Sequence, residues 1–176
     1  MVTSARGIVL ALALISGTAS AQRCGATCSN GDAVVGLSEQ ALTAMLPEIE
    51  RVPKPIRGPR NGLGRWVLKD LILGNEPYDA TYFIRSGHVS RIEYLSTANL
   101  SRCTQRIPFD TALSELRSQY GESQVHGSFE AEGAYSQSAA FNTQTVDISL
   151  HLASSPDSCS TRVVFLKRAQ KDGTDL

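Results

Sequence analysis

The sequence predicts an α+β protein with two tandem units, each a helix followed by an antiparallel meander, that form one sheet with the helices on one face. The clearest observation is a β-hairpin pattern over residues 78–95, where two runs rich in aromatic and β-branched residues flank the turn 85–88. Helical patterns precede and follow this hairpin. A second hairpin begins at Asp147, 68 residues after the first begins at Asp79. The predicted regions are a signal peptide (1–21), a disulfide-stapled N-terminal arm (22–36), two α-β units (37–100 and 101–168) and a disordered tail (169–176).

The first 21 residues have the pattern of a cleaved export signal. Arg6 is their only charge, residues 7–15 are apolar, and Ala19-Ser20-Ala21 offers the small-x-small pattern that signal peptidases cut. This apolar run is about half of the ~20 residues needed to cross a bilayer, and no later stretch approaches that length. We therefore expect a periplasmic or secreted protein, cleaved after Ala21, with no transmembrane segment in the mature chain.

Four cysteines, Cys24, Cys28, Cys103 and Cys159, are expected to form two disulfides in an exported chain. Three pairings are possible. We favour Cys24 with Cys28, which are near neighbours, and Cys103 with Cys159, each of which lies beside a predicted strand. Cys24 to Cys28 is one residue longer than the C-x-x-C redox motif and has no nearby His or Cys to complete a zinc set, so a structural role is favoured over a redox or metal site.

The first unit is expected to begin with a helix at Leu37, capped by Ser38 and ended or kinked by Pro47. Residues 51–64 contain three prolines and three glycines and are expected to form a loop. Residues 66–73 are apolar on both faces, which favours a strand buried on both sides, although a short helix would give a similar pattern.

The hairpin that follows has one face suited to a core and one suited to water. Side chains alternate between the two faces of a strand. The expected core face carries Ala80, Tyr82, Ile84, Ile92 and Tyr94, and the expected open face carries Thr81, Phe83, Arg85, Arg91 and Glu93.

The second unit is expected to repeat this arrangement. A connector over 96–106 precedes a helix over 109–120, with Asp110 as its N-cap and Gly121 as its C-terminal stop. Strands are expected around Phe129 and over 135–141, 145–152 and 161–166.

A helix followed by an antiparallel meander, in an exported disulfide-bearing chain of this size, resembles the β-lactamase inhibitor proteins and the small SmpA/OmlA outer-membrane assembly proteins. The resemblance covers the architecture of most of the mature chain and no diagnostic motif. The lipoprotein cysteine of the second group is missing, and the cysteine spacing does not map onto the first. The resemblance implies a binding role for the exposed sheet face, although fold alone does not establish function.

Two groups of residues are candidates for binding a protein partner. The first lies on the expected open sheet face: Phe83, Arg85, Arg91 and His151. An exposed aromatic among arginines is a typical interface anchor, and burial of Phe83 under the N-terminal arm is the alternative. The second is Arg57, Arg60 and Arg65, within a stretch from Arg51 to Lys69 that has six basic residues and no acidic one. This stretch is suited to an acidic partner, an anionic lipid head or a phosphorylated sugar, or it is simply a solvated mobile loop.

The predicted function is that of a non-enzymatic binding protein of the inhibitor, immunity or envelope-accessory type, without a cofactor or metal. The whole chain has 17 basic and 17 acidic residues, which disfavours nucleic acid as its partner. The main alternative is a small envelope hydrolase with an unrecognised active site. The three histidines, His88, His126 and His151, are isolated from one another in the sequence, and Glu130 and Glu132 are interpreted as solvated charges of a strand face. A third alternative is a structural accessory of a secretion machine.

Overall fold

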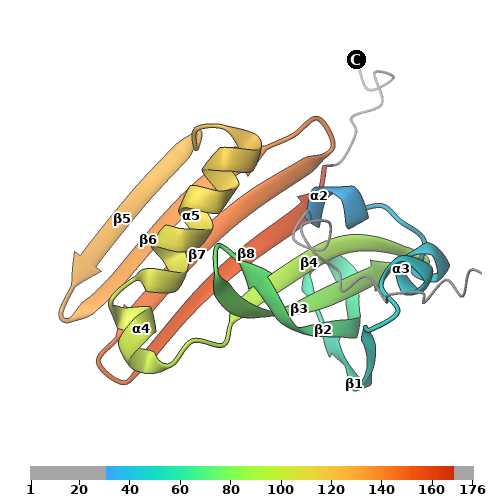
Figure 1. Ribbon diagram of the computed structural model, residues 1–176, viewed down its shortest axis with the longest axis horizontal. Coiled ribbons are helices and arrows are strands. Elements are labelled where there is room, and N and C mark those ends of the chain that lie inside the picture. The colour runs from blue at the N-terminus through green and yellow to red at the C-terminus, as the bar shows by residue number, and fades with distance from the viewer. Residues whose placement is uncertain (1–30, 169–176) are drawn as a thin grey trace, which may run out of the picture.

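The computed structural model describes residues 31–168 and contains one eight-stranded antiparallel sheet with helices (Figure 1). The order of the strands in the sheet is β1-β2-β3-β4-β8-β7-β6-β5. The predicted α+β class is therefore confirmed. The strands are β1 (Glu50–Arg57), β2 (Leu63–Leu73), β3 (Glu76–Arg85), β4 (His88–Ser96), β5 (Val125–Ala131), β6 (Ala134–Asn142), β7 (Val146–Ser155) and β8 (Ser158–Lys167).

The helices have recognisable local causes. They are α2 (Gly31–Val34), α3 (Glu39–Met45), the 3-10 turn η1 (Pro59–Asn61), α4 (Leu100–Thr104) and α5 (Ile107–Tyr120). The Ser38 hydroxyl accepts a hydrogen bond from the Ala41 amide at 3.1 Å, which confirms Ser38 as the N-cap of α3. Gly121, with φ of 81°, ends α5 as expected. Within the expected N-terminal arm at 22–36, residues 31–34 form α2.

The expected N-cap of α5 is wrong. The helix begins at Ile107, with Arg106 as its N-cap and Pro108 in its first turn. Proline is favoured there because its missing amide would have no intrahelical partner. Asp110 consequently lies inside the helix, where its carboxylate forms an ion pair with Arg106 at 3.1 Å.

The expected loop at 51–64 is also largely wrong. Residues 50–57 form β1 at the edge of the sheet, and the connection to β2 is confined to residues 58–62. Pro53 and Pro55 do not prevent strand formation, because an edge strand has one side that needs no ladder partner. The register shifts between the pairs Arg51–Trp66 and Ile56–Gly64, which is where the prolines lie.

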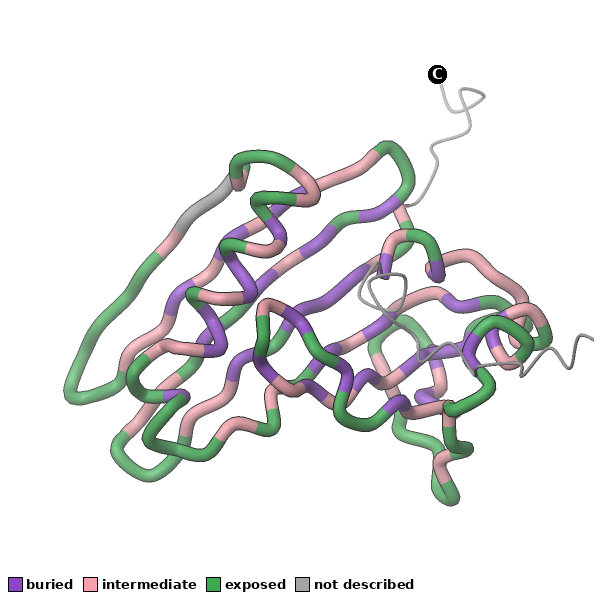
Figure 2. The backbone as a smooth tube through the Cα atoms, viewed as in Figure 1, coloured by how far each residue is buried: buried purple, intermediate pink, exposed green. Residues whose placement is uncertain are grey.

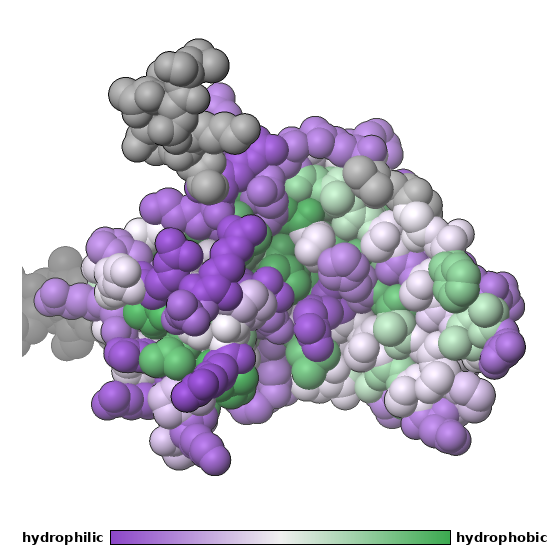
Figure 3. Space-filling view, turned by 180° about the vertical axis from the view of Figure 1, so that it is seen from behind, coloured by the Kyte–Doolittle hydropathy of each residue, from purple (hydrophilic) through white to green (hydrophobic). Residues whose placement is uncertain are grey.

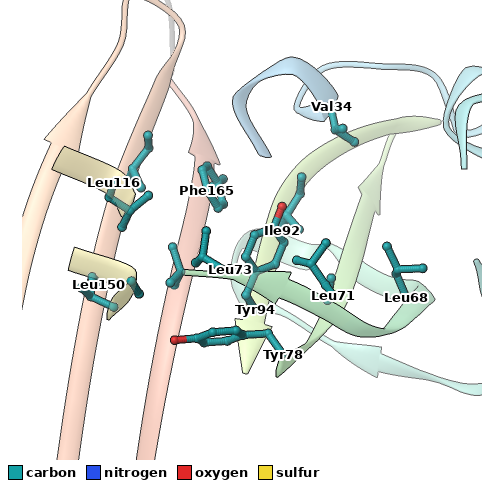
Figure 4. Close-up of a cluster of buried hydrophobic side chains, with 14 of the residues drawn as sticks. Val34, Leu68, Leu71, Leu73, Tyr78, Ile92, Tyr94, Leu116, Leu150 and Phe165 are labelled. Carbon is teal, nitrogen blue, oxygen red and sulfur yellow. The ribbon is translucent and has the colours of Figure 1, made fainter. Parts of the chain in front are cut away.

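The hydrophobic core lies between the helices and one face of the sheet (Figures 2 and 4). The expected alternation of the hairpin is confirmed in part, because Tyr82, Ile92 and Tyr94 are almost completely buried. Figure 4 shows Leu116 of α5 and Leu150 of β7 beside Phe165 of β8, with Leu73 and Tyr94 next to them. The two halves of the chain therefore share one core.

Polar contacts fix the helices on this core. The Tyr78 hydroxyl donates to the Pro108 carbonyl at 2.7 Å, which holds the start of α5 against β3. The Tyr120 hydroxyl donates to the Asp32 carboxylate at 2.8 Å, which joins the end of α5 to α2. Burial raises the pKa of both tyrosines, so these hydroxyls stay protonated and able to donate at ordinary pH.

A disulfide between Cys103 and Cys159 joins α4 to the start of β8, with 5.8 Å between the two Cα atoms. The pairing predicted for these two cysteines is confirmed. Cys24 and Cys28, the proposed signal peptide and the tail at 169–176 lie outside the described residues. Within residues 31–168, none of the helices has both the length and the apolar character required to span a membrane.

Candidate functional site

The sheet face opposite the helices contains two neighbouring hollows. The first, here called the concave groove, has a volume of ≈ 430 Å³ and crosses β4, β8, β7 and β6. The second, here called the basic hollow, has a volume of ≈ 570 Å³ and lies beside the β3–β4 turn. Figure 3 views the molecule from behind and shows apolar side chains between strongly hydrophilic ones on this side. Arg91 and Leu166 line both hollows, so the two hollows lie next to each other.

Strand register assembles the concave groove from residues far apart in the sequence. Arg91 of β4 is paired with Leu166 of β8, which is paired with Asp147 of β7. Another row joins Arg162 of β8 to His151 of β7. The groove is lined by Arg91, Gln124, Ala140, Phe141, Asn142, Asp147, Ile148, Ser149, His151, Arg162, Val164 and Leu166. Two of the expected open-face residues, Arg91 and His151, are therefore in one site.

An ion-pair cluster fixes the charged side chains at the groove. The Arg91 guanidinium contacts the Glu93 carboxylate at 2.6 Å, and both side chains are less than one-fifth exposed, at 18% and 19%. The other Glu93 oxygen lies 3.8 Å from the Arg162 guanidinium. One carboxylate thus holds two arginines from adjacent strands. Such partly buried, charge-assisted contacts restrict side-chain motion more than isolated surface pairs do.

His151 lies on the same face and is exposed to solvent. Partial desolvation of the ring, together with the positive charges of Arg162 and Arg91, lowers the pKa of His151 below its usual value of 6.5. The imidazole is therefore neutral at pH 7. It adds a hydrogen-bonding group to the groove without adding charge.

Phe83 differs from the expectation of an exposed aromatic anchor. It lies on the expected face of β3, yet it is only 4% exposed. A Cβ atom at Gly58 would come within 2.5 Å of the ring, and one at Gly64 within 3.2 Å, so the ring packs against the backbone of the β1–β2 connection. The connection covers Phe83, and the expectation that its ring is free for a partner is wrong.

The three arginines expected to form a second contact are separated by the structure. Arg65 forms an ion pair with Glu39 of α3 at 3.3 Å, and the neighbouring Trp66 indole donates to the same carboxylate at 2.8 Å. Arg57 is exposed near the end of β1 and lines neither of the two hollows. Of the three, only Arg60 lines the basic hollow.

The basic hollow collects cationic side chains from four segments. Arg60 comes from η1, Arg85 from the end of β3, and Arg91 from β4. Lys167 ends β8, and Arg168 directly follows it. Its other lining residues are Pro59, Ser86, His88, Val89, Ser90 and Leu166. Acidic residues are absent from this lining, although Glu93 and Asp147 contact two of its arginines from outside. The hollow has the electrostatic character of an anion site.

Several residues of these hollows were missed by the sequence reasoning. Arg162 and Leu166 lie on one face of β8, as the period of two predicts, and Arg168 directly follows the end of this strand. Their position beside Arg91 does not follow from this period, because it depends on the pairing of β4 with β8. The sequence signal that was available is the alternation of side chains along β8. This alternation indicates which residues share a face, but it does not indicate which strands lie beside them.

The comparisons with known proteins identified no relative: no family model matches the chain, and no curated protein or solved structure is significantly similar to it. Within the described part of the chain, no group of three or more His, Cys, Asp or Glu side chains is arranged to hold a metal ion. The geometry and the charge of the two hollows are therefore the features that indicate a function.

Proposed function

We propose that this chain is an exported, non-enzymatic binding protein that holds a protein partner in the concave groove. The observation that carries the proposal is the Arg91–Glu93–Arg162 cluster beside the apolar side chains of Val164 and Leu166. A fixed set of charges around an apolar centre is the usual composition of a protein interface. An inhibitor, an immunity protein or an envelope accessory would use such a surface.

The charge of the groove specifies the chemistry of the partner. Three arginines lie at the groove or beside it, against two carboxylates that are already paired with them. The side chains that β6 and β7 contribute at Ala140 and Ser149 are small, which leaves room for a partner's side chains. A partner segment carrying both acidic and apolar side chains is complementary to this surface.

The proposal includes a tandem organisation of the fold. Helix α3 precedes the meander β1–β4, and helix α5 precedes the meander β5–β8, so each unit would combine a helix with four strands. In the first unit, β1 is the strand that was not expected. The units would join where β4 pairs with β8. This organisation supports the proposed function because the joining strands supply the central charges of the groove. The resemblance to β-lactamase inhibitor proteins and SmpA/OmlA proteins implies the same use of the sheet face.

Site-specific photocrosslinking tests the proposal. A benzoylphenylalanine at Ser149, which lines the groove, should yield a discrete crosslinked partner from a native envelope extract. The same group at Ser118, exposed on α5, should not. Arg162→Glu should abolish the crosslink at Ser149 by reversing a groove charge. Equal crosslinking at Ser149 and Ser118, or a Ser149 crosslink that Arg162→Glu leaves unchanged, would contradict the proposal.

A further inference from the structure

We propose that the basic hollow is a binding site for a small amphiphilic oxyanion, that is, a carboxylate, phosphate or sulfonate carried on a short apolar body. This site differs from the protein interface proposed above in the class of its ligand, which is a small molecule. The inference holds whether or not a protein partner occupies the concave groove.

Two of the arginines that line the hollow are available to a ligand. Arg91 and Arg168 line the hollow and are paired, with Glu93 at 2.6 Å and with Asp147 at 2.6 Å. Arg60 and Arg85 also line it, and within residues 31–168 neither forms an ion pair or a side-chain hydrogen bond. Two guanidinium groups therefore remain for an anion, and guanidinium is the side chain best suited to two-point binding of an oxyanion.

The backbone of the β1–β2 connection fixes the position of the Arg60 Cα atom. The connection that carries it is closed by hydrogen bonds from the Gly58 amide to the Gly62 carbonyl at 2.8 Å and from the Gly62 amide to the Pro59 carbonyl at 3.2 Å. Arg60 has a φ of 55°, in the left-handed region that residues with side chains rarely adopt. Such strained residues cluster at functional sites.

The Phe83 ring anchors the same connection to the sheet. It packs beneath Gly58, and the Ser90 hydroxyl donates to the Phe83 carbonyl at 3.2 Å. Ser90 itself lines the hollow. The wall that carries Arg60 is therefore attached to the strands that carry Arg85 and Arg91, and the backbone segments that carry the arginines are held together before a ligand arrives. Preorganisation of this kind reduces the entropy lost on binding.

The size and the lining of the basic hollow suit a small amphiphilic molecule. A volume of ≈ 570 Å³ lies within the range of roughly 300–1,000 Å³ that small-molecule sites occupy. The lining includes Pro59, Val89 and Leu166 as well as the arginines. A bare inorganic anion would leave these apolar residues without a partner. A ligand with an anionic head and an apolar body matches both parts of the lining.

The test is a titration of the folded chain with monomeric octyl phosphate, followed by calorimetry and by NMR shifts. We expect saturable binding of one molecule, with the largest shifts at Arg60, Arg85 and Leu166. Octyltrimethylammonium, which has the same body and the opposite charge, should not bind. Inorganic phosphate should bind at least tenfold more weakly than octyl phosphate, because it lacks the apolar body.

Paired variants locate the site. Arg60→Ala with Arg85→Ala should weaken octyl phosphate binding at least tenfold. The matched control, Arg51→Ala with Lys54→Ala, removes two exposed cations of β1 outside the hollow and should leave binding unchanged. Thermal unfolding of both variants verifies that they fold. Unchanged binding in the Arg60/Arg85 variant, or equal binding of octyltrimethylammonium, would overturn the proposal. So would binding to phosphatidylglycerol vesicles without binding to octyl phosphate, which would make the hollow a membrane contact.

Discussion

The Phe83 ring lies directly beneath Gly58, so close that a Cβ atom at Gly58 would stand 2.5 Å from the ring. This contact attaches the β1–β2 connection to the open face of the sheet. Phe83, which was expected to bind a partner, therefore has a structural role. The contact has consequences for stability that can be measured.

Gly58→Ala should destabilise the protein by about 1–3 kcal/mol, because the new methyl group must displace either the ring or the connection. Chemical denaturation measures this change. Gly127→Ala is the control: its methyl group would meet only the Ser138 hydroxyl at 3.4 Å, an ordinary contact. A Gly58 variant as stable as the Gly127 variant would show that Phe83 and Gly58 are not in firm contact in solution.

Removal of the Cys103–Cys159 disulfide should lower the free energy of unfolding by roughly 2–4 kcal/mol. The two cysteines are separated by 56 residues, so the bond restricts the unfolded chain strongly. Urea unfolding of the Cys103→Ser/Cys159→Ser variant, compared with the wild-type chain, gives the difference. A smaller loss than about 1 kcal/mol would mean that the unfolded state gains little freedom without the bond.

The pKa of His151 should lie below 6.5, and Arg162→Ala should raise it by removing a nearby positive charge. NMR titration of the imidazole measures both values. Because the folded-state pKa is depressed, the unfolded state takes up the proton first as pH falls. The stability that neutral His151 contributes is thus fully present above about pH 6.5 and is lost as pH falls through the folded-state pKa. His151→Gln should remove this part of the pH dependence, whereas His88→Gln should not.

Arg102→Ala should destabilise the protein by about 1–3 kcal/mol. The Glu76 side chain is only 5% exposed and forms its ion pair with Arg102, so loss of the arginine leaves a buried carboxylate without its counterion. Arg102 is about half exposed, and solvent screening keeps the loss below that of a fully buried pair.

A double-mutant cycle separates this cause from a loss of packing. Glu76→Gln should rescue part of the stability of the Arg102→Ala variant, because it removes the unpaired charge. An Arg102→Ala/Glu76→Gln variant no more stable than Arg102→Ala alone would contradict the electrostatic explanation.

Local patterns predicted the hairpin well, because the alternation of Tyr82 with Phe83 and of Ile92 with Arg91 can be recognised from residues adjacent in the sequence. They also predicted the pairing of Cys103 with Cys159. The edge strand β1 was missed because Pro53 and Pro55 indicate a loop unless the position of the strand in the sheet is known. The start of α5 was predicted too late in the sequence, because proline is compatible with the first turn of a helix as well as with a helix end. Pro108 lies in that first turn.

The candidate site was less predictable than the elements that carry it. Arg91 and His151 were found from their faces, but Arg162 became their neighbour only through the pairing of β4 with β8 and of β8 with β7. Contacts between strands so distant in sequence depend on the register of the whole sheet. The covering of Phe83 likewise depends on how residues 58–62 cross the sheet, which no periodicity encodes.

Strand β8, the last in sequence among residues 31–168, lies in the middle of the sheet between β4 and β7. Before Ser158–Lys167 has been synthesised and has paired with them, β4 and β7 are both edge strands with unpaired backbone amides and carbonyls. The complete sheet therefore cannot form without residues 158–167, and a chain truncated before residue 158 would leave two separate half-sheets, each with an additional unpaired edge strand.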